Sequence, residues 1–460
     1  MEIQTGGASF PNDPSNVPVA MLETLLHNAL TAQINRGSLR VTYPSGRVEA
    51  YGGRAGPTVA IRILDAGALR SIVLDPPLAV PEMYMDGRLT IETGDPYDLI
   101  ALFSLNTEPE RSTVWAELNH LRRSVTAAPV AKAIGLKRAR ANVAHHYDLD
   151  ERLYRLFLDG DMQYSCAWFE QPGMSLDAAQ LAKKRLIAAK LLVRPGARIL
   201  DIGCGWGGMA LYLARVCEAE VTGVTLSQEQ LRVARARAEA AGLGDRVRFE
   251  LCDYREVAGQ FDNIVSVGMF EHVGLRRYPA FFETAARLLA PDGVMLLHSI
   301  GQPTPPRYNQ PFIEKYIFPG GHIPPLSEVM GPVEKSGLLI RDVEILTLHY
   351  AETLKEWRRR FLAARDRVLA LYDERFIRMW DFYLAGSEAA FRFYAMHVFH
   401  LQLARDQERV PLTRAYLAPE MARLRAIEAR IPDYAALLAP QPVPDAASDV
   451  KTPVPRSARC

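Results

Sequence analysis

The sequence predicts an α/β protein with a doubly wound, mostly parallel sheet and added helices, preceded by a small N-terminal α+β domain. Between residues 199 and 298, short apolar strands alternate with amphipathic helices, a pattern typical of a parallel sheet covered on both faces. A glycine-rich segment, 203–208, follows the first of these strands and precedes its helix. The N-terminal part instead shows short alternating strands separated by Gly and Pro, which favours a separate domain.

Length and composition exclude several classes of protein. A chain of 460 residues is long enough for two or three domains, and an apolar content of 48% suffices for a sizeable core. The formal net charge of +1 argues against a dedicated nucleic-acid-binding protein. The five cysteines are scattered and lack CxxC or zinc-finger spacing, so we expect a reducing compartment, no disulfide framework and no metal site. Because neither a secretory signal nor a membrane-spanning stretch is visible, we expect a soluble cytoplasmic protein that can still touch membranes.

Composition divides the chain into five segments. Residues 1–18, rich in Gly, Pro and Asn, and the Pro- and Ala-rich tail 438–460 are predicted to be disordered. Residues 19–118 are expected to form the small domain and 142–437 the larger one, with a basic linker, 119–141, between them. In the small domain we expect a helix at 21–34, strands at 39–43, 59–64 and 72–74, and a helix at 97–105.

The basic linker leaves two interpretations open. It carries no acidic residue between Leu121 and Ala141, and apolar residues are interleaved with its basic ones. It is either a solvated linker helix or a segment that adsorbs to anionic lipid, where each basic residue near the surface contributes roughly 1 kcal/mol. The basic residues are Arg122, Arg123, Lys132, Lys137, Arg138 and Arg140.

The larger domain contains the alternating strands and helices. Its expected strands are 199–202, 221–225, 247–251, 263–267, 294–298 and 343–348, and its expected helices are 176–192, 209–216, 228–241 and 278–289. Two long helices follow, and the apolar stripe of the second continues through Val398 and Leu401. Such stripes usually face a core, whereas a groove for an aliphatic chain is the minority interpretation.

Polar residues stand at the carboxyl ends of the predicted strands. Ligands of open parallel sheets bind at this edge, so we expect the functional site there. These residues are Asp201, Thr225, Asp253, Glu271 and His298.

The glycine-rich segment predicts a binding site for a nucleotide-like ligand. Without a Cβ, glycine lets such a ligand lie against the backbone, and the amides that open the next helix face its polar groups. The spacing also matches the GxGxxG pattern of NAD-binding folds, but strand 221–225 does not end in an acidic residue that would hold the ribose. Asp201 before the glycines and Asp253 after the third strand favour S-adenosylmethionine (SAM) instead. A glycine-rich turn that binds nothing remains the third alternative.

Seven motifs follow one another along the larger domain. They are Tyr164-Ser-Cys166, Asp201-Ile-Gly-Cys-Gly-Trp-Gly207, Thr225-Leu-Ser-Gln-Glu-Gln230, Asp253-Tyr-Arg255, Ser266-Val-Gly-Met-Phe-Glu-His-Val-Gly274, Leu297-His-Ser-Ile-Gly301 and Lys315-Tyr-Ile-Phe-Pro-Gly320. In this order they strongly resemble the cyclopropane-fatty-acyl-phospholipid synthase family of SAM-dependent methyltransferases. The resemblance runs from about Asn142 to about Leu403 and implies a seven-stranded methyltransferase sheet. Residues 19–118 resemble the family's small lipid-handling domain more loosely.

The resemblance implies which residues contact SAM. Tyr164 and Ser165 would contact its methionine end, and Gly203 and Gly205 would underlie it. Asp201, which precedes these glycines, would also bind SAM. The ribose side and the adenine would meet a second set of residues, namely Thr225, Leu226, Gln230, Asp253 and Tyr254.

The resemblance also implies a bicarbonate ion near the SAM sulfonium. Its ligands would be Cys166, Glu271, His298, Ile300 and Tyr350, with backbone amides acting at Cys166 and Ile300. Methyl transfer to an alkene leaves a carbocation, and bicarbonate would take the proton that is lost as the ring closes, a step of general-base catalysis.

Several of these residues also have a purely structural interpretation. The minority interpretation of Glu271 is a carboxylate that interacts with a helix N-terminus, and that of His298 is a core histidine at the end of an apolar strand. The aromatic rings of Tyr164, Phe270 and Tyr316 would stabilise a cation by roughly 0.5–2 kcal/mol each, or would simply pack.

The leading functional hypothesis is transfer of a methylene group from SAM to the double bond of unsaturated acyl chains in membrane phospholipids, which forms cyclopropane fatty acids. A fatty-acyl methyltransferase that gives a methylene or methyl branch shares every motif, because the two differ only in which proton leaves the cation. A catalytically silent lipid-binding adaptor is a third hypothesis. We expect peripheral association with the inner face of the membrane, no nucleic-acid partner, and a homodimer as a further hypothesis.

Overall fold

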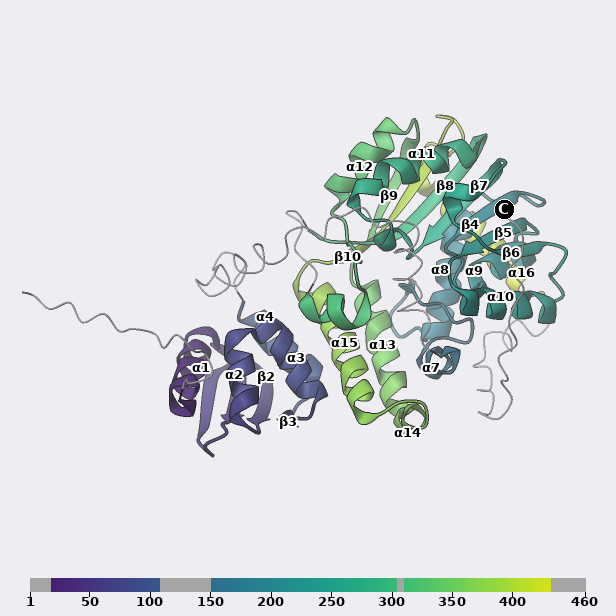
Figure 1. Ribbon diagram of the computed structural model, residues 1–460. Coiled ribbons are helices and arrows are strands. Elements are labelled where there is room, and N and C mark those ends of the chain that lie inside the picture. The colour runs from purple at the N-terminus through teal and green to yellow at the C-terminus, as the bar shows by residue number, and fades with distance from the viewer. Residues whose placement is uncertain (1–17, 108–149, 304–309, 432–460) are drawn as a thin grey trace, which may run out of the picture. The chain divides into compact units, whose positions relative to one another are not determined.

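The structure is a computed structural model that describes residues 18–107, 150–303 and 310–431 (Figure 1). The chain forms two compact units. The smaller unit holds the N-terminal residues together with Glu374–Phe382, and the larger unit holds the rest of the described chain. The basic linker 119–141 lies outside the described residues. So do residues 1–17 and the tail 438–460, for which disorder is predicted.

The smaller unit is a three-stranded antiparallel sheet packed against helices. Its strands are in the order β1 (Arg36–Thr42), β2 (Val48–Ile63) and β3 (Leu89–Thr93). Inward-facing residues such as Leu39 and Val41 are completely buried against Leu69 and Leu102 of the helices. The helices are α1 (Val19–Gln33), α2 (Ala66–Leu74), α3 (Pro76–Met85) and α4 (Pro96–Leu105).

The strand predicted at 72–74 is wrong. These residues end α2, which begins after Asp65, whose carboxylate accepts a hydrogen bond from the Ala68 amide at 3.0 Å. Ile72 and Val73 are buried in the core of the unit from this helix. A run of three apolar residues fits a helix face as well as a strand, and the N-terminal cap decides between them. The third strand is β3 instead, which the pattern did not indicate.

The larger unit confirms the doubly wound, mostly parallel sheet of seven strands. The strand order is β6-β5-β4-β7-β8-β10-β9. The first five strands in this order are parallel, and β10 runs antiparallel to both of its neighbours. The strands are β4 (Arg198–Ile202), β5 (Glu220–Thr225), β6 (Val247–Leu251), β7 (Phe261–Val267), β8 (Leu289–Gly301), β9 (Leu339–Leu346) and β10 (His397–Ala404).

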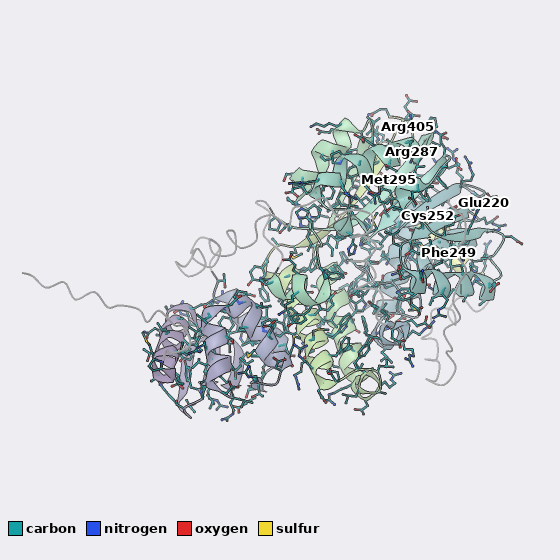
Figure 2. The ribbon with its side chains drawn as sticks, in the orientation of Figure 1. Glu220, Phe249, Cys252, Arg287, Met295 and Arg405 are labelled. Carbon is teal, nitrogen blue, oxygen red and sulfur yellow. The ribbon has the colours of Figure 1, made fainter. Side chains whose placement is uncertain are left out.

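Helices cover both faces of this sheet (Figure 1). One core packs α8 (Leu176–Leu191), α9 (Gly208–Val216), α10 (Gln228–Ala240) and α16 (Leu417–Glu428) on one face. The other core packs α11 (Tyr278–Leu288) and α12 (Leu326–Lys335) on the opposite face. Phe249 of β6 and Met295 of β8 are buried in these two cores (Figure 2). Further α-helices in the described residues are α7 (Glu151–Phe157), α13 (His349–Ala363), α14 (Arg365–Leu369) and α15 (Glu374–Phe393), of which residues Glu374–Phe382 belong to the smaller unit.

The helix predicted to continue through Val398 and Leu401 is wrong. α15 ends at Phe393, Ala395 has a positive φ of 55°, and β10 begins at His397. The three-residue spacing of Val398 and Leu401 suggested a helix. In a central strand both faces are buried, so the polar alternation that would reveal a strand is lost.

Among the described helices, none combines the length and hydrophobicity that crossing a bilayer requires.

Candidate active site

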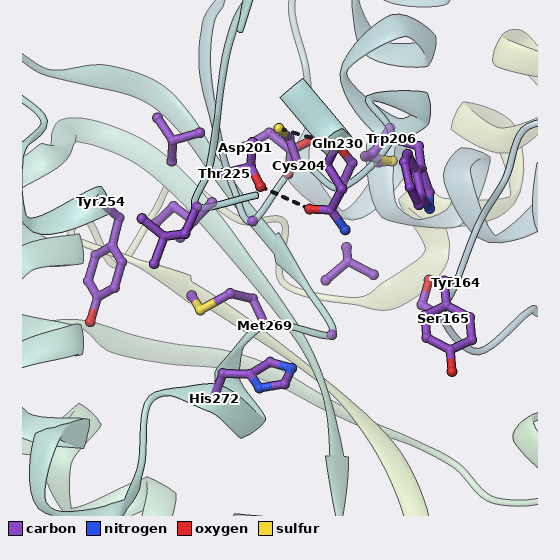
Figure 3. A pocket seen from close by; sticks show the side chains of 18 of the residues that line it. Tyr164, Ser165, Asp201, Cys204, Trp206, Thr225, Gln230, Tyr254, Met269 and His272 are labelled. Carbon is purple, nitrogen blue, oxygen red and sulfur yellow. Dashed lines mark hydrogen bonds between the residues drawn. The ribbon is translucent and has the colours of Figure 1, made fainter. Parts of the chain in front are cut away.

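One cavity lies at the carboxyl ends of β4, β5 and β7, the edge where the sequence predicts a site (Figure 3). All ten residues predicted to bind SAM line it. Several further lining residues have no role predicted from the sequence, although most of the additional lining residues lie within the seven motifs. These further residues include Gln163, Trp206, Met269, His272 and Arg277.

The glycine loop forms the floor of this cavity. The amides of Gly203 and Cys204 both donate to the Val224 carbonyl on β5, at 2.9 and 3.0 Å, which ties the loop to the neighbouring strand. Gly203 and Gly205 have positive φ angles of 80° and 53°, where residues with a Cβ are strained. At Gly205 no atom lies within 4 Å of an added Cβ, so a methyl group there would enter the cavity.

Gly208, the first residue of α9, is held in a much tighter place. An added Cβ would lie 2.5 Å from Asp161 Oδ2 and closer still to Gln163 Nε2. The Asp161 carboxylate is buried and ion-paired with both Lys184 and Arg237, so it has no freedom to move aside. The close approach of these charged groups therefore requires glycine at position 208.

Two alanine substitutions in the loop are expected to behave differently. Gly208→Ala should lower the free energy of unfolding by about 1–3 kcal/mol, because it overpacks a buried ion network. Gly205→Ala should cost only about 1 kcal/mol in backbone strain but should weaken SAM binding, because its methyl group enters the cavity. Thermal unfolding together with SAM titration of both variants checks this. Equal stability of the two variants would show that the ion network around Asp161 can shift to accommodate the added methyl group.

Asp201 supplies an unsatisfied carboxylate to the cavity. Its side chain is 2% exposed, and its Oδ2 has no hydrogen-bond partner among the described residues. Burial raises the pKa of this carboxyl group to about 7. A cationic ligand group would satisfy this buried atom.

The ends of β5 and β6 shape the rest of the cavity wall. The Thr225 hydroxyl donates to Gln230 Oε1 at 2.9 Å, which turns the amide nitrogen of Gln230 toward the cavity (Figure 3). The Asp253 carboxylate is held by the Arg255 guanidinium, with an N–O distance of 2.7 Å. Burial raises the pKa of the neighbouring Tyr254 to about 12, so its phenol stays protonated. Leu226 also lines this wall.

The turn that carries Tyr164 and Ser165 is supported from beneath by a buried lysine. Lys183 of α8 is completely buried, and its Nζ donates to Ser165 Oγ at 2.8 Å and to Gln163 Oε1 at 2.7 Å. Burial lowers the pKa of Lys183 to about 7. The Tyr164 ring stacks on Trp357, with centroids 5.1 Å apart. Sequence reasoning missed Lys183, because the run Lys183-Lys184-Arg185 in a helix does not by itself show that these side chains are buried.

Glu271 and His298 do not line the cavity; they lie behind the residues that do. The short turn Phe270–His272 follows β7, and Met269 and His272 beside Glu271 face the cavity. Glu271 Oε1 accepts the Ile300 amide at 2.7 Å. Glu271 Oε2 and His298 Nε2 are both buried without a partner among the described residues.

Burial shifts the pKa values of both groups toward their neutral forms. It raises the pKa of Glu271 and lowers that of His298 well below its usual range. Each buried polar atom without a partner is costly, so a polar group bound beside it would relieve that cost.

Three other predicted site residues lie elsewhere in this region. Cys166 is completely buried, and burial raises the pKa of its thiol, which disfavours a thiolate. Tyr350 packs against Phe391, with ring centroids 4.9 Å apart. The Ile300 amide, predicted to hold bicarbonate, donates to Glu271 instead.

Phe270, a candidate for cation stabilisation, is buried in the sheet core and stacks on Tyr278 at 4.2 Å, which makes it a packing residue.

The fold and the cavity define the class of protein: the chain is a class I methyltransferase. Within this class it belongs to the mycolic acid cyclopropane synthetase family, which matches residues 135–401. Residues 25–109 match a separate domain family of unknown function.

Three relatives illustrate the range of the family. A probable fatty acid methyltransferase of Pseudomonas putida is 41% identical over 257 residues, which cover 54% of this chain and 65% of the relative. A tuberculostearic acid methyltransferase of Mycobacterium tuberculosis is 43% identical over 281 residues, which cover 58% and 66%. The chain therefore spans just under two thirds of the length of these two proteins. The cyclopropane-fatty-acyl-phospholipid synthase of Escherichia coli is 36% identical over 351 residues, which cover 76% of this chain and 88% of that enzyme.

Two solved structures share the fold at similar identity. A cyclopropane synthase from Mycobacterium tuberculosis superposes with a TM-score of 0.56 at 34% identity, covering 58% of this chain and 98% of that one. A mycolic acid cyclopropane synthase complexed with SAH and CTAB gives a TM-score of 0.55 at 36% identity, covering 57% and 97%.

Proposed function

We propose that this protein transfers a methylene group from SAM to the double bond of an unsaturated acyl chain in a membrane phospholipid, forming a cyclopropane ring. The observation that carries the proposal is the pair of buried, unsatisfied atoms Glu271 Oε2 and His298 Nε2 behind a cavity that suits SAM. Membership of the cyclopropane synthetase family supports the same chemistry.

The cavity residues fit the chemical groups of SAM. The unsatisfied carboxylate of Asp201 suits the amino group of the methionine moiety. The Gln230 amide nitrogen is a donor for ribose hydroxyls, and Lys183 behind Ser165 favours the methionine carboxylate when it is protonated. Bound there, SAM supplies the electrophilic methyl group. What the chain adds is orientation, and good orientation supplies roughly 7–11 kcal/mol of a barrier of this kind.

The pair behind the cavity fits a bicarbonate ion. Such an ion both donates and accepts hydrogen bonds, so Glu271 Oε2 is a suitable acceptor for it, and His298 Nε2 is a suitable donor when it carries a proton. Bound bicarbonate would supply the base for the final deprotonation. Glu271 and His298 are 8% and 1% exposed, which keeps water away from a carbocation that water would otherwise capture.

The Ile300 amide enters this proposal as the group that orients Glu271. By donating to Oε1 at 2.7 Å, it leaves Oε2 as the free atom of the carboxylate. Cys166 lies in the same turn as Tyr164, and Tyr350 packs against Trp357, the ring on which Tyr164 stacks, so both are proposed as further ligands of the ion.

A second candidate product is a methylene or methyl branch. The two relatives named as fatty acid methyltransferases are 41% and 43% identical, against 36% for the cyclopropane synthase. The reactions share methyl transfer and the carbocation that it leaves. Loss of a proton from the new methyl group as the ring closes gives a cyclopropane, whereas a 1,2-hydride shift followed by loss of a proton from that methyl group gives a methylene branch. A saturated methyl branch needs, in addition, a reduction by a separate hydride donor.

Lipid analysis distinguishes these products. Expressed in a bacterial host that lacks cyclopropane fatty acids, the protein should add one CH2 to unsaturated phospholipid acyl chains. Proton NMR should then show ring protons for a cyclopropane, or vinylic methylene protons for a branch. A protein that binds SAM by calorimetry yet adds no carbon to lipid would contradict the proposal and favour the silent lipid-binding adaptor.

The substrate also implies a location. We propose that the protein works peripherally at the inner face of the membrane, and that the basic linker 119–141, outside the described residues, contributes to adsorption on anionic lipid.

A further inference from the structure

His298 and His400 face each other from neighbouring strands. They are register partners on β8 and β10, and His298 Nδ1 lies 2.8 Å from His400 Nε2. The other ring nitrogen of His400, Nδ1, lies 3.4 Å from Lys190 Nζ on α8. Lys190 Nζ in turn lies 2.5 Å from Glu344 Oε2 on β9. Each of the three residues His298, His400 and Lys190 is only 1% exposed.

Charged and titratable groups surround the three buried side chains of His298, His400 and Lys190. Lys183 and Lys190 face it from α8, Glu344 from β9 and His349 from the start of α13. Burial, reinforced by the two lysines, lowers the pKa of both imidazoles well below their usual range. The geometry requires the same state, because a doubly protonated His400 would point an N–H at the Lys190 ammonium. Both rings are therefore neutral, and each carries one proton.

The ammonium at one end determines where each proton sits. An ammonium group only donates hydrogen bonds, so His400 Nδ1 must accept from Lys190. Glu344 Oε2, at 3.8 Å from His400 Nδ1, is too far to accept a proton from that atom. The proton of His400 is consequently on Nε2, which donates to His298 Nδ1. The proton of His298 is then on Nε2, the buried atom that lacks a partner.

We propose that Lys190 and His400 are positioning residues that hold His298 in the tautomer with its proton on Nε2, so that a hydrogen-bond donor faces the anion site beside Glu271. The proposal rests on the proposed function, in which an anionic base binds there. The orientation of one ring nitrogen by the hydrogen bond of the other is the general way in which proteins select a histidine tautomer.

Two nearly isosteric substitutions at His400 separate this role from simple packing. In His400→Gln, the amide oxygen accepts from Lys190 and the amide nitrogen donates to His298, so the polarity is kept. In His400→Glu, the carboxylate next to Lys190 only accepts, so His298 must donate from Nδ1, and its Nε2 becomes an acceptor. Lys190→Met, which removes the ammonium, is a second variant of independent design.

Nitrogen-15 NMR of histidine-labelled, full-length protein at pH 7.5 reads the tautomer directly. We expect wild type and His400→Gln to show His298 protonated on Nε2, and His400→Glu to show it protonated on Nδ1. The bicarbonate concentration for half-maximal methylation should be similar in wild type and His400→Gln, and about tenfold or more higher in His400→Glu, because a donor to an anion is lost. SAM affinity should not change in any of the three proteins.

The wild-type spectrum alone is sufficient to overturn the proposal: a His298 proton on Nδ1 would do so. Identical tautomers in the Gln and Glu variants would also do so. If the Glu variant does not fold, Lys190→Met must give a mixture of His298 tautomers, and a single unchanged Nε2–H form would refute the idea. Failure of the proposed function has a different signature, namely wild-type protein with the Nε2–H tautomer that methylates no lipid at any bicarbonate concentration.

Discussion

Replacing Glu271 with Gln is expected to reduce turnover by about 10²–10⁴-fold, the range that general-base catalysis typically supplies, while SAM binding stays unchanged. Gln keeps an oxygen that can accept the Ile300 amide, so the turn after β7 retains its shape. It replaces the unsatisfied Oε2 with an NH2 group, which cannot accept a hydrogen bond from a bound bicarbonate. Glu271 does not line the cavity, so the SAM contacts remain.

Steady-state methylation of phospholipid vesicles and SAM calorimetry measure the two effects separately. The matched control is Glu420→Gln on α16, which makes the same chemical change at an exposed ion pair with Arg423 and should alter the rate less than about twofold. Full activity of Glu271→Gln would show that Glu271 does not help to hold the catalytic base. A parallel loss of SAM binding would mean that Glu271 only supports the fold.

The sequence was sufficient to predict the SAM cavity because its residues occupy places fixed by local rules. In a parallel sheet, residues that directly follow the strands meet at one edge. Asp201 and Thr225 lie at the carboxyl ends of β4 and β5, Asp253 follows β6, and all three line the cavity. The glycine loop between β4 and α9 was equally readable, since its positive φ angles and close approaches require glycine.

The groups behind the cavity were not readable, because their partners depend on long-range register. His400 contacts His298 only because β10 inserts between β8 and β9, and the sequence pattern placed that segment in a helix. In the sequence, Lys183 and Lys190 look like ordinary surface residues of a helix, yet the sheet and the Tyr164 turn bury both of them. Only the tertiary structure shows which charged residues of an amphipathic pattern lie inside.

The affinity for SAM is expected to rise with pH up to about 7 and then to level off, because of Asp201. Burial raises the pKa of this carboxyl group to about 7 in the free protein. A cationic methionine amino group beside it would favour the ionised form and lower that pKa, so binding releases a proton below pH 7. The association constant should therefore increase by up to about tenfold per pH unit between about pH 5.5 and 7.

The same raised pKa predicts the opposite pH dependence for the stability of the free protein, which should fall as the pH rises. The folded state holds a proton on Asp201 that the unfolded chain, with a carboxyl pKa of 3.8, has released. The contribution of Asp201 to the free energy of unfolding is thus fully present below pH 3.8, falls as the pH rises, and is lost above about 7.

Asp201→Asn is expected to abolish both dependences. It keeps the shape of the side chain but removes its titration, so the free protein should become more stable than wild type above pH 7. SAM affinity should fall by about 10- to 100-fold at pH 7.5, the loss expected when a hydrogen bond between charged groups is removed. Calorimetry from pH 5.5 to 7.5, in buffers with different ionisation enthalpies, counts the released proton directly. A wild-type affinity that does not change with pH, or a variant that still releases a proton, would show that Asp201 does not face the cationic end of SAM.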